Sequence, residues 1–499
     1  QGKESLFDFN SDDVDVVDQN VTATDNVSVV SKWKENGTNT KYIFYADLFH
    51  SISTLDLDMK DHSLSVDSDP AIFYVQGWDT QLNIHDAVNI EATAHYGNIV
   101  YNSGNGNSIS LQAQNDIRLT QAEQKDSGAS ITVSGGSELT LDAGHDIVLK
   151  NYGIYNTIGI GSKADVKMKA GNDIVFNNYS RGNMILVDEG SNPSEGGKLQ
   201  MVAGHDITFN QSYNDPRLAS SLSLLVLQDY SDTTITAGND INFNRYKYSP
   251  FIDLYRYAKA VITAKGNINF REQASSVASA LYATEVQNHS NLTLEAQAIT
   301  GNMQQMVNAH DTSQVLVKAH NIYWDAQGED LSELAAEYPA VTSTIVSDNG
   351  SKVELQVDKD IHVSVGVPNT LLYAYGWGGH ITLNAGDSIY LHSAGQADDA
   401  SLAAIRALDG TVDLTSGGTI TVDSEGKTAA YAETSGNINF NGKTVLSGAG
   451  IGAWSTTDSK MGMNPWSEET SKIIFNDFVT MNPVNTGAKA QYNGDIIFN

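Results

Sequence analysis

The sequence contains no cysteine in its 499 residues, so disulfide bonds contribute nothing to its stability. A chain that crosses an oxidising compartment unfolded benefits from lacking thiols, because no premature disulfide can form. Positive charge is also scarce: 29 Lys and Arg stand against 60 Asp and Glu, a formal net charge of −31. Such a surface repels nucleic acid and anionic membranes, so we expect no nucleic-acid partner, and it favours cations or cationic partners.

Long apolar runs are missing as well. No stretch approaches the roughly 18 apolar residues that a membrane-spanning helix needs. The first residues, QGKESLFDFNSDD, lack the basic and then apolar start of a signal peptide. A mature chain and an excised fragment of a longer protein would both look like this.

Glycine is plentiful, with 42 residues against 8 prolines, and it recurs in a repeated phrase. The stretch AGHDIVLKN (143–151) returns with small changes at 170–178, 203–211 and 237–245. The isoleucine of this phrase recurs at intervals of 27 to 34 residues, at Ile90, Ile117, Ile147, Ile174, Ile207, Ile241 and Ile268. Weaker copies follow at Ile299, Ile322, Ile361, Ile389, Ile420 and Val445. A period near 30 residues along most of the chain indicates a solenoid.

Each period is typical of three short strands. In residues 370–391 the segments LLYAY, HITLN and SIYL are separated by turns that contain glycine, and they are rich in Thr, Val, Ile and Tyr. The sequence therefore predicts an all-β fold, a right-handed parallel β-helix of roughly 16 turns, as a single domain over 1–499. We expect one helical insertion at 328–338 and a C-terminal loop or cap within 450–499.

The residues of the repeated phrase are those that we expect in a tight turn. We expect Ala-Gly to permit a sharp bend with positive φ, and Asp to bond the backbone amides of the turn. The aspartates at 146, 173, 206 and 240 should then lie in a row, which suits a structural role better than a unique catalytic site. Cation binding at this acidic row is an alternative, because stacked carboxylates repel each other unless they are screened.

The repeat resembles the passenger domains of bacterial autotransporters (type V secretion). The AG-x-DI turns, the stretches AGNDINFN (237–244) and GNINFNGKTVLSG (436–448), and the acidic, cysteine-free composition carry the resemblance, and haemagglutinin-like exoproteins share this turn. The resemblance implies a secreted or cell-surface virulence factor, mostly an adhesin or biofilm protein. It also implies a C-terminal outer-membrane barrel, which this sequence lacks and which we expect in the full-length protein.

Motifs for catalysis are weak. The segment KDSGAS (125–130) has Lys125 where the serine-protease motif of this family has glycine, so we interpret Ser127 as a turn residue. His145 and His205 occupy the variable position of the repeat turn, and we interpret them as surface residues. The segment DLDMKDH (56–62) lacks the glycine of a calcium loop. We therefore predict no catalytic residue, no metal site and no cofactor.

Two aromatic segments are the candidates for ligand binding. NRYKYSPFIDLYRYAK (244–259) combines tyrosines with basic residues, and LLYAYGWGGH (371–380) falls on the equivalent strand about four turns later. Aromatic rings stack on flat ligands and form binding hot spots, whereas aromatic packing in the core is the structural alternative. The candidate residues are Arg245, Tyr246, Tyr248, Phe251, Tyr255, Arg256, Tyr257, Tyr373, Tyr375 and Trp377.

These observations favour an extracellular bacterial surface adhesin that binds a host matrix protein, a glycan or another bacterium along an extended face. Two alternatives remain open. The chain could associate with itself and promote cell aggregation and biofilm, or it could be a β-helical polysaccharide lyase or hydrolase, for which clustered carboxylates would be needed.

Overall fold

The computed structural model is built from β-strands; the part of the chain that it describes contains no helix. The expected helical insertion at 328–338 lies outside the described residues, and so do 458–469 of the expected C-terminal cap. No helix among the described residues is long and apolar enough to cross a membrane. The structure describes residues 5–8, 19–31, 42–48, 53–123, 129–180, 182–188, 190–212, 223–245, 250–272, 282–326, 343–366, 370–394, 403–426, 428–457, 470–483 and 485–499.

The chain forms two compact units. Unit 1 comprises Gln1–Tyr246 and Tyr257–Lys265, and unit 2 comprises Lys247–Arg256 and Gly266–Asn499. In each unit a repeat contributes one strand to a first sheet, sheet A, and then two successive strands or one long bent strand to a second sheet, sheet B. The three strands per repeat that the sequence predicts are therefore present.

Unit 1 holds the strands of the repeated AG-x-DI phrase. Its sheet A strands are β1(Ser5–Asp8), β4(Tyr42–Leu48), β6(Ala71–Gly77), β8(Val100–Ser103), β11(Ile131–Ser134), β14(Ile158–Ile160), β17(Ile185–Val187) and β20(Leu225–Gln228). Its sheet B strands are β2(Gln19–Thr22), β3(Val27–Ser31), β5(Ser53–Ser68), β7(Thr80–Ala94), β9(Ser108–Ala113), β10(Ile117–Gln121), β12(Glu138–Ala143), β13(Ile147–Asn151), β15(Asp165–Ala170), β16(Ile174–Asn178), β18(Lys198–Ala203), β19(Ile207–Gln211), β21(Asp232–Ala237), β22(Ile241–Arg245) and β24(Lys259–Ala264).

Unit 2 repeats the same order. Its sheet A strands are β23(Ile252–Tyr255), β26(Tyr282–Val286), β28(Gln305–Ala309), β30(Ser343–Asp348), β33(Thr370–Tyr375), β36(Ala403–Leu408), β38(Thr428–Glu433), β40(Ile451–Thr456) and β43(Thr486–Gln491). Its sheet B strands are β25(Asn267–Glu272), β27(Asn291–Gly301), β29(Gln314–Ala326), β31(Lys352–Val357), β32(Ile361–Val365), β34(His380–Ala385), β35(Ile389–Ser393), β37(Thr411–Ser424), β39(Asn437–Ser447), β41(Ser471–Phe475), β42(Val479–Asn482) and β44(Gly494–Phe498).

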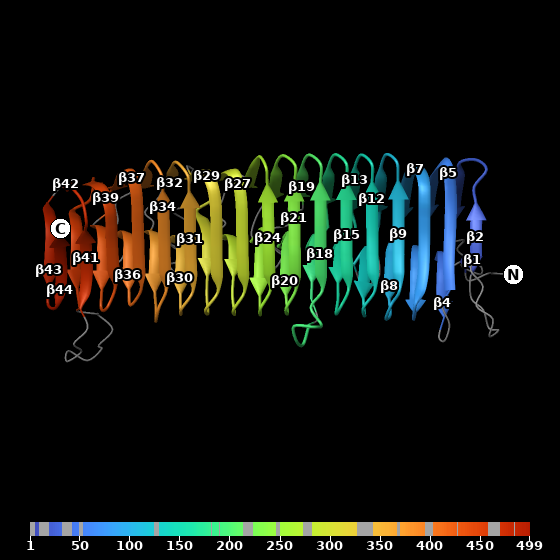
Figure 1. Ribbon diagram of the computed structural model, residues 1–499, viewed down its shortest axis with the longest axis horizontal. Helices are drawn as coiled ribbons and strands as arrows, with labels where there is room; N and C mark the ends of the chain where they lie inside the picture. The colour runs from blue at the N-terminus through green and yellow to red at the C-terminus, as the bar shows by residue number, and fades with distance from the viewer. Residues whose placement is uncertain are drawn as a thin grey trace. The chain divides into compact units, whose positions relative to one another are not determined.

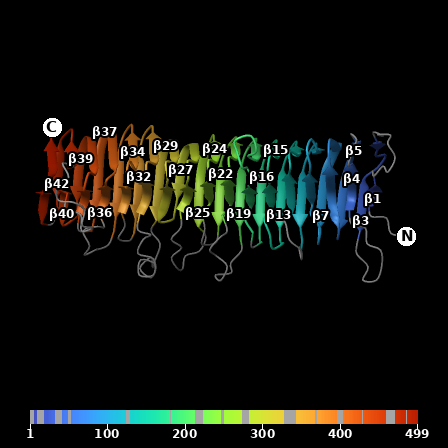
Figure 2. The ribbon, with the colours of Figure 1, turned by 90° about the horizontal axis from the view of Figure 1, so that it is seen from below.

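In unit 1, equivalent strands of successive repeats pair in parallel, as β9, β12, β15 and β18 do side by side in Figure 1. Figure 2 shows the same arrangement for β13, β16 and β19. The anchoring isoleucines are register partners from repeat to repeat and are fully buried, in the order Ile90, Ile117, Ile147, Ile174, Ile207 and Ile241. The parallel β-helix that the repeat predicts is confirmed.

Unit 2 continues its own isoleucine row with one difference. The residues Ile268, Ile299, Ile322, Ile361, Ile389 and Ile420 are successive register partners. The next partner, however, is Thr444 rather than Val445. Thr444 is buried, whereas Val445 points away from the core, so the expectation for Val445 is wrong by one residue. The register between β37 and β39 shifts after Thr415, and this irregularity moves the anchor.

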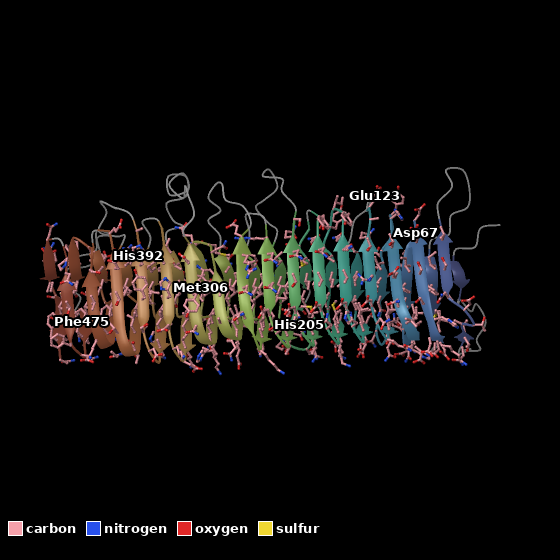
Figure 3. The ribbon with its side chains drawn as sticks, turned by 90° about the horizontal axis from the view of Figure 1, so that it is seen from above. Asp67, Glu123, His205, Met306, His392 and Phe475 are labelled. Carbon is pink, nitrogen blue, oxygen red and sulfur yellow. The ribbon has the colours of Figure 1, made fainter. Side chains whose placement is uncertain are left out.

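The repeated turn joins the two sheet B strands of a repeat, and its aspartates form the expected row. The backbone N–H of Asp206 donates to Oδ1 of Asp173 at 2.9 Å, and the N–H of Asp240 donates to Oδ1 of Asp206 at the same distance. Each aspartate thus holds the turn of the next repeat rather than its own turn. Figure 3 shows His205, beside Asp206, at this margin of unit 1, with Glu123 at the opposite margin.

Glycine serves the turn for a different reason than expected. Gly144, Gly171, Gly204 and Gly238 are not among the glycines with positive φ. Instead, a Cβ on each of the last three would overlap the backbone carbonyl oxygen of the glycine one repeat earlier. The turns stack backbone on backbone, so glycine is needed for close approach and not for a left-handed bend.

We predict that Gly171→Ala destabilises unit 1 by about 2–3 kcal/mol, because the new methyl group must push two backbones apart. Thermal unfolding followed by circular dichroism measures the effect. Gly159→Ala in β14 is the matched control, since its methyl group meets only the Cβ of Ala129, at 3.3 Å. Equal melting temperatures for the two variants would contradict this account of the turn.

Candidate binding surface

The face of sheet A in unit 2 that lies opposite the core-facing side carries a row of mostly large polar and aromatic side chains, among which Asn308, Val346 and Tyr431 are buried. Strand β33 illustrates its origin: Leu372 and Ala374 are buried, and Tyr373 between them points away from the core. Strand pairing places the equivalent residues of successive strands next to each other. We call the following residues the outward row: Asp253, Glu285, Asn308, Val346, Tyr373, Arg406, Tyr431, Trp454 and Lys489.

One end of the outward row is acidic. Asp253 and Glu285 are direct register partners on β23 and β26. Burial, together with the neighbouring Glu285 charge, raises the pKa of Asp253 to about 7. Burial also raises the pKa of Glu285, although His310 and a 2.6 Å hydrogen bond from Gln287 oppose this shift. Two carboxyl groups this close are not both charged at neutral pH without cost.

An ion pair lies beside the acidic end. Nδ1 of His310 is 2.7 Å from Oδ2 of Asp348. Burial would lower the pKa of His310, but the hydrogen bond and charge of Asp348 and the charge of Glu285 raise it. Burial would raise the pKa of Asp348, but hydrogen bonds from His310 and Tyr375 lower it. Each group of the pair thus favours the charged form of the other, and the Tyr375 hydroxyl is held by the same carboxylate.

The middle of the outward row is a stack of rings and a guanidinium. The rings of Tyr373 and Tyr375 stack with their centroids 4.7 Å apart. The guanidinium of Arg406 lies 5.0 Å from the Tyr373 ring centroid and pairs with Glu433 at 3.0 Å. Burial raises the pKa of Tyr373, so its hydroxyl stays neutral. The charge of Arg406 is thus matched within the protein, and the stack offers aromatic and hydroxyl groups.

The other end repeats this chemistry. The rings of Tyr431 and Trp454 are 5.1 Å apart, and Nζ of Lys489 lies 3.9 Å from the centroid of the Trp454 ring. A cation over an aromatic face at this distance is a stabilising contact. Along this part of the row a ring is followed by a cation, then by two rings and a second cation.

Trp377 follows the Tyr373–Tyr375 stack directly and is the most exposed large apolar residue described. Its side chain is 88% exposed, at a turn where Gly376 and Gly378 on either side have φ of +66° and +84°. Left-handed conformations of this kind favour glycine, so the turn holds the indole outward. An indole in water at a fixed turn is a typical binding element.

The structure places the candidate residues in 245–257 in different environments. Tyr246 and Tyr248 lie outside the described residues. Arg245 is only 2% exposed and Phe251 is fully buried, so no ligand reaches them where the structure places them.

Three further candidates remain at or near the surface. Tyr255 is half-buried, with the Arg256 guanidinium 5.0 Å from its ring centroid. Arg256 and Tyr257 form a left-handed turn after β23. In unit 1, the exposed Tyr257 stacks on Tyr230 at 4.8 Å.

The second candidate segment is placed as expected. Strand β33 is four register steps from β23 in sheet A, through β26, β28 and β30. The structure brings Tyr373 and Tyr375 together, and the exposed Trp377 lies in the turn that directly follows them.

Sequence reasoning missed the rest of the aromatic part of the row: Arg406, Tyr431, Trp454 and Lys489. A signal exists for three of them, because Tyr431, Trp454 and Lys489 are each one large residue between small ones, in AYA, AWS and AKA; Arg406 follows Ile405 and lacks this signal. Trp78 was also missed; like Trp377 it follows a glycine of positive φ, Gly77, and is exposed.

No family model, no curated protein and no solved structure matches the chain. The resemblance to autotransporter passenger domains therefore rests on the repeat pattern and composition, and it stays a prediction.

We predict a pH effect at Asp253. Because its folded-state pKa of about 7 lies above the ordinary value of 3.8, the folded protein keeps a proton that the unfolded chain releases. The stabilisation is present below pH 4 and is lost as the pH rises toward 7. Asp253→Asn should match the parent in stability at pH 4 and exceed it at pH 8, with the difference growing by up to about 1.4 kcal/mol per pH unit in between.

Urea unfolding of the two proteins at a series of pH values measures this difference. Asp358→Asn in unit 2 is the control, because the Asp358 carboxylate is highly exposed. A stability difference between parent and Asp253→Asn that does not change with pH would contradict the prediction.

Proposed function

We propose that the chain is an extracellular bacterial adhesin that binds glycan chains through Trp377 and the aromatic part of the outward row. The observation that carries the proposal is the exposed indole of Trp377 beside the stacked rings of Tyr373 and Tyr375. Sugar rings present flat apolar faces edged by hydroxyl groups, and a ring platform with polar edges complements both features.

The charges of this surface support a neutral ligand. Arg406 is paired with Glu433, and His310 is paired with Asp348. A strongly anionic ligand would have to compete with these internal partners, and the net charge of −31 would repel it. An uncharged polysaccharide or a neutral part of a glycan meets neither obstacle.

The row also suits an extended ligand. Strands of the same sheet lie about 4.8 Å apart, so successive side chains of the row recur at a fixed short interval. Many weak contacts along one chain-like ligand give high combined affinity without a deep pocket. The location at a bacterial cell surface belongs to the same proposal and rests on the cysteine-free, acidic repeat.

Self-association is a second candidate, and a specific observation in unit 1 favours it. Asn177, Asn210 and Asn244 lie outside the core in one row, with amide-to-amide hydrogen bonds of 3.0 Å between neighbours. The exposed rings of Tyr152 and Tyr179 stack at 4.6 Å. Such regular polar and aromatic rows can pair with the same rows of a second copy.

We predict that Trp377→Ala lowers glycan affinity by about tenfold or more, as expected for a central aromatic hot spot. A glycan array identifies the ligand, and titration calorimetry then measures the affinity of both proteins. Tyr323→Ala is the control, because Tyr323 is an exposed aromatic residue of unit 2 on sheet B. It should bind like the parent.

Three outcomes would contradict the glycan proposal. A glycan array without any hit would show that glycans are not the ligand. Unchanged affinity in Trp377→Ala would show that Trp377 is not part of the binding site. Aggregation of cells that display the chain, abolished by Tyr152→Ala with Tyr179→Ala and accompanied by no array hit, would favour self-association instead.

A further inference from the structure

The stacked turns of unit 1 alternate between two dipeptides. Before the anchoring isoleucine the chain reads Asn115–Asp116, His145–Asp146, Asn172–Asp173, His205–Asp206 and Asn239–Asp240 in successive repeats. The asparagines have a defined partner, since the Asn172 side chain donates to Oδ1 of Asp146 at 2.9 Å and the Asn239 side chain donates to Oδ1 of Asp206 at 2.8 Å. The histidines occupy the same turn position and make a different contact.

Each of these histidines faces two carboxylates with one nitrogen. Nδ1 of His145 lies 3.3 Å from Oδ1 of Asp116, in the preceding turn, and 3.2 Å from Oδ2 of Asp146. Nδ1 of His205 likewise lies 3.3 Å from Oδ1 of Asp173 and 3.4 Å from Oδ2 of Asp206. The same three-residue arrangement is thus built twice, two repeats apart.

Each histidine is within hydrogen-bonding distance of a carboxylate oxygen, but the contacts are longer than the roughly 2.7–2.9 Å of charge-assisted hydrogen bonds. Elsewhere in the described residues His310 and His380 approach a single carboxylate oxygen at 2.7 Å each, whereas His392 and His320 stay 3.2 and 3.5 Å from theirs. What distinguishes the two turn groups is that one imidazole nitrogen is shared between the oxygens of two carboxylates.

The nitrogen-to-oxygen distances of 3.2–3.4 Å also fit a common metal ion. With metal–ligand bonds of about 2.0–2.1 Å, neighbouring ligands of a tetrahedral ion are about 3.3 Å apart. In each group the nitrogen and the two carboxylate oxygens lie within 4.8 Å of one another.

The second carboxylate of each group is held through its other oxygen, whereas in the first carboxylate the oxygen that faces the histidine also accepts a backbone N–H, from Asp146 or from Asp206. Oδ1 of Asp206, the oxygen turned away from His205, accepts bonds from the Asn239 side chain and from the backbone N–H of Asp240. Oδ1 of Asp146 is held in the same way by Asn172 and by the N–H of Asp173. Such outer partners fix the ligand oxygen in metal sites.

We propose that Asp116, His145 and Asp146, and likewise Asp173, His205 and Asp206, bind a divalent transition-metal ion of the zinc type. One imidazole nitrogen with two carboxylate oxygens suits this class better than calcium or magnesium, which prefer oxygen ligands alone. The histidine side chains are 60% and 56% exposed, so water completes the coordination. An ion here would join two successive turns, and its ligands would include the histidines, which the sequence alone predicts only to be surface residues.

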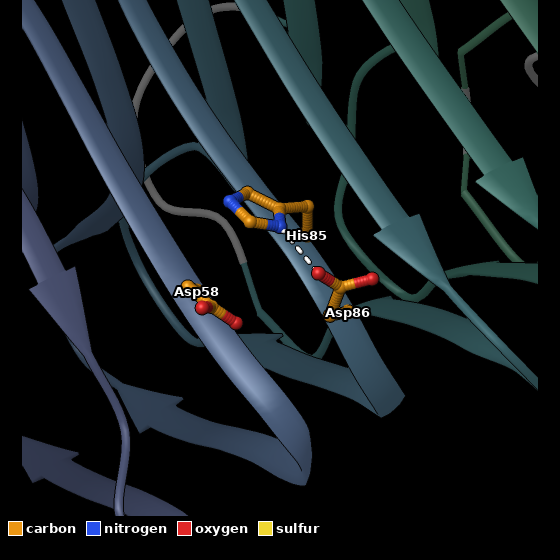
Figure 4. A group of neighbouring side chains, drawn as sticks. All are labelled: Asp58, His85 and Asp86. Atoms are coloured by element: carbon orange, nitrogen blue, oxygen red, sulfur yellow. Dashed lines mark hydrogen bonds and ion pairs between the residues drawn. The ribbon is translucent and has the colours of Figure 1, made fainter.

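A third group, Asp58, His85 and Asp86, has a similar composition but a different geometry. In Figure 4 the dashed line joins Nδ1 of His85 to Asp86, a distance of 2.9 Å, and Nε2 is 3.1 Å from Asp56. Burial would lower the pKa of His85, but hydrogen bonds to Asp86 and Asp56 raise it above its ordinary value. Both nitrogens face carboxylate oxygens at hydrogen-bonding distance, so this imidazole has no nitrogen left to coordinate an ion.

The two proposed sites differ in one neighbouring charge. Arg118 pairs with Oδ2 of Asp116 at 2.7 Å, and the equivalent position of the second site is Val175. A guanidinium this close repels a divalent ion. The site of Asp173, His205 and Asp206 should therefore bind more tightly.

The test is calorimetric titration of ZnCl₂ into the metal-free full chain at neutral pH. We expect His145→Asn and His205→Asn each to lose one zinc equivalent, and the double variant to lose both. Asparagine is the residue of the alternate turns, so these variants keep the fold, which circular dichroism checks. Zinc should raise the melting temperature of the parent and leave that of the double variant unchanged.

Arg118→Val supplies a change in the opposite direction, and we expect it to raise the affinity of the weaker site severalfold. A double variant that binds as many zinc ions as the parent, with the same affinities, would overturn the proposal. So would a parent chain that binds calcium at these residues and zinc no better. In either case the two histidines would be hydrogen-bonded surface groups.

Discussion

The close stacking of one repeat turn on the next is the constraint on which the rest of the structure depends. At Gly171 and Gly204 the backbones approach so closely that no side chain fits between them. The aspartates of the same turns then hold the next repeat by accepting its backbone N–H. A shift of one residue would turn every side chain to the opposite face of the sheet. This contact therefore also sets the register of the two strands that flank the turn. The buried isoleucines and the outward rows both follow from that register.

Much of the fold could be predicted because the same residue types recur at equivalent positions in successive repeats. The isoleucine anchors were correct from Ile90 to Ile420, since a missing rung would leave a cavity between its neighbours. The reason given for glycine was wrong, because the letters Ala-Gly look the same whether a turn needs positive φ or close approach. Val445 failed for a related reason. The register shift after Thr415 cannot be seen in one sequence, and Thr444 is small enough to take the inward position.

The binding surface was only partly predictable. Alternation is a poor guide over the four residues of β23, where Phe251 precedes the strand and is buried, and Arg256 already belongs to a turn. Tyr373 and Tyr375 were found because they lie close together in the sequence. Arg406, Tyr431, Trp454 and Lys489 each stand alone in their strands, and only the register shows that they are neighbours.

The same register explains how groups of functional side chains can form on a repeat structure. Where every copy of a buried position is equal, as with the anchoring isoleucines from Ile90 to Ile420, the row forms the core and distinguishes no site along the chain. Where the copies differ, neighbouring turns place unlike groups side by side: histidine between two aspartates in unit 1, or arginine against tyrosine in unit 2. Such a group of side chains can arise by single substitutions, because the stacked backbone already fixes the positions of neighbouring residues. At the histidine turns of unit 1 and in the outward row of unit 2, the residue type therefore changes from one repeat to the next while the strand register is kept.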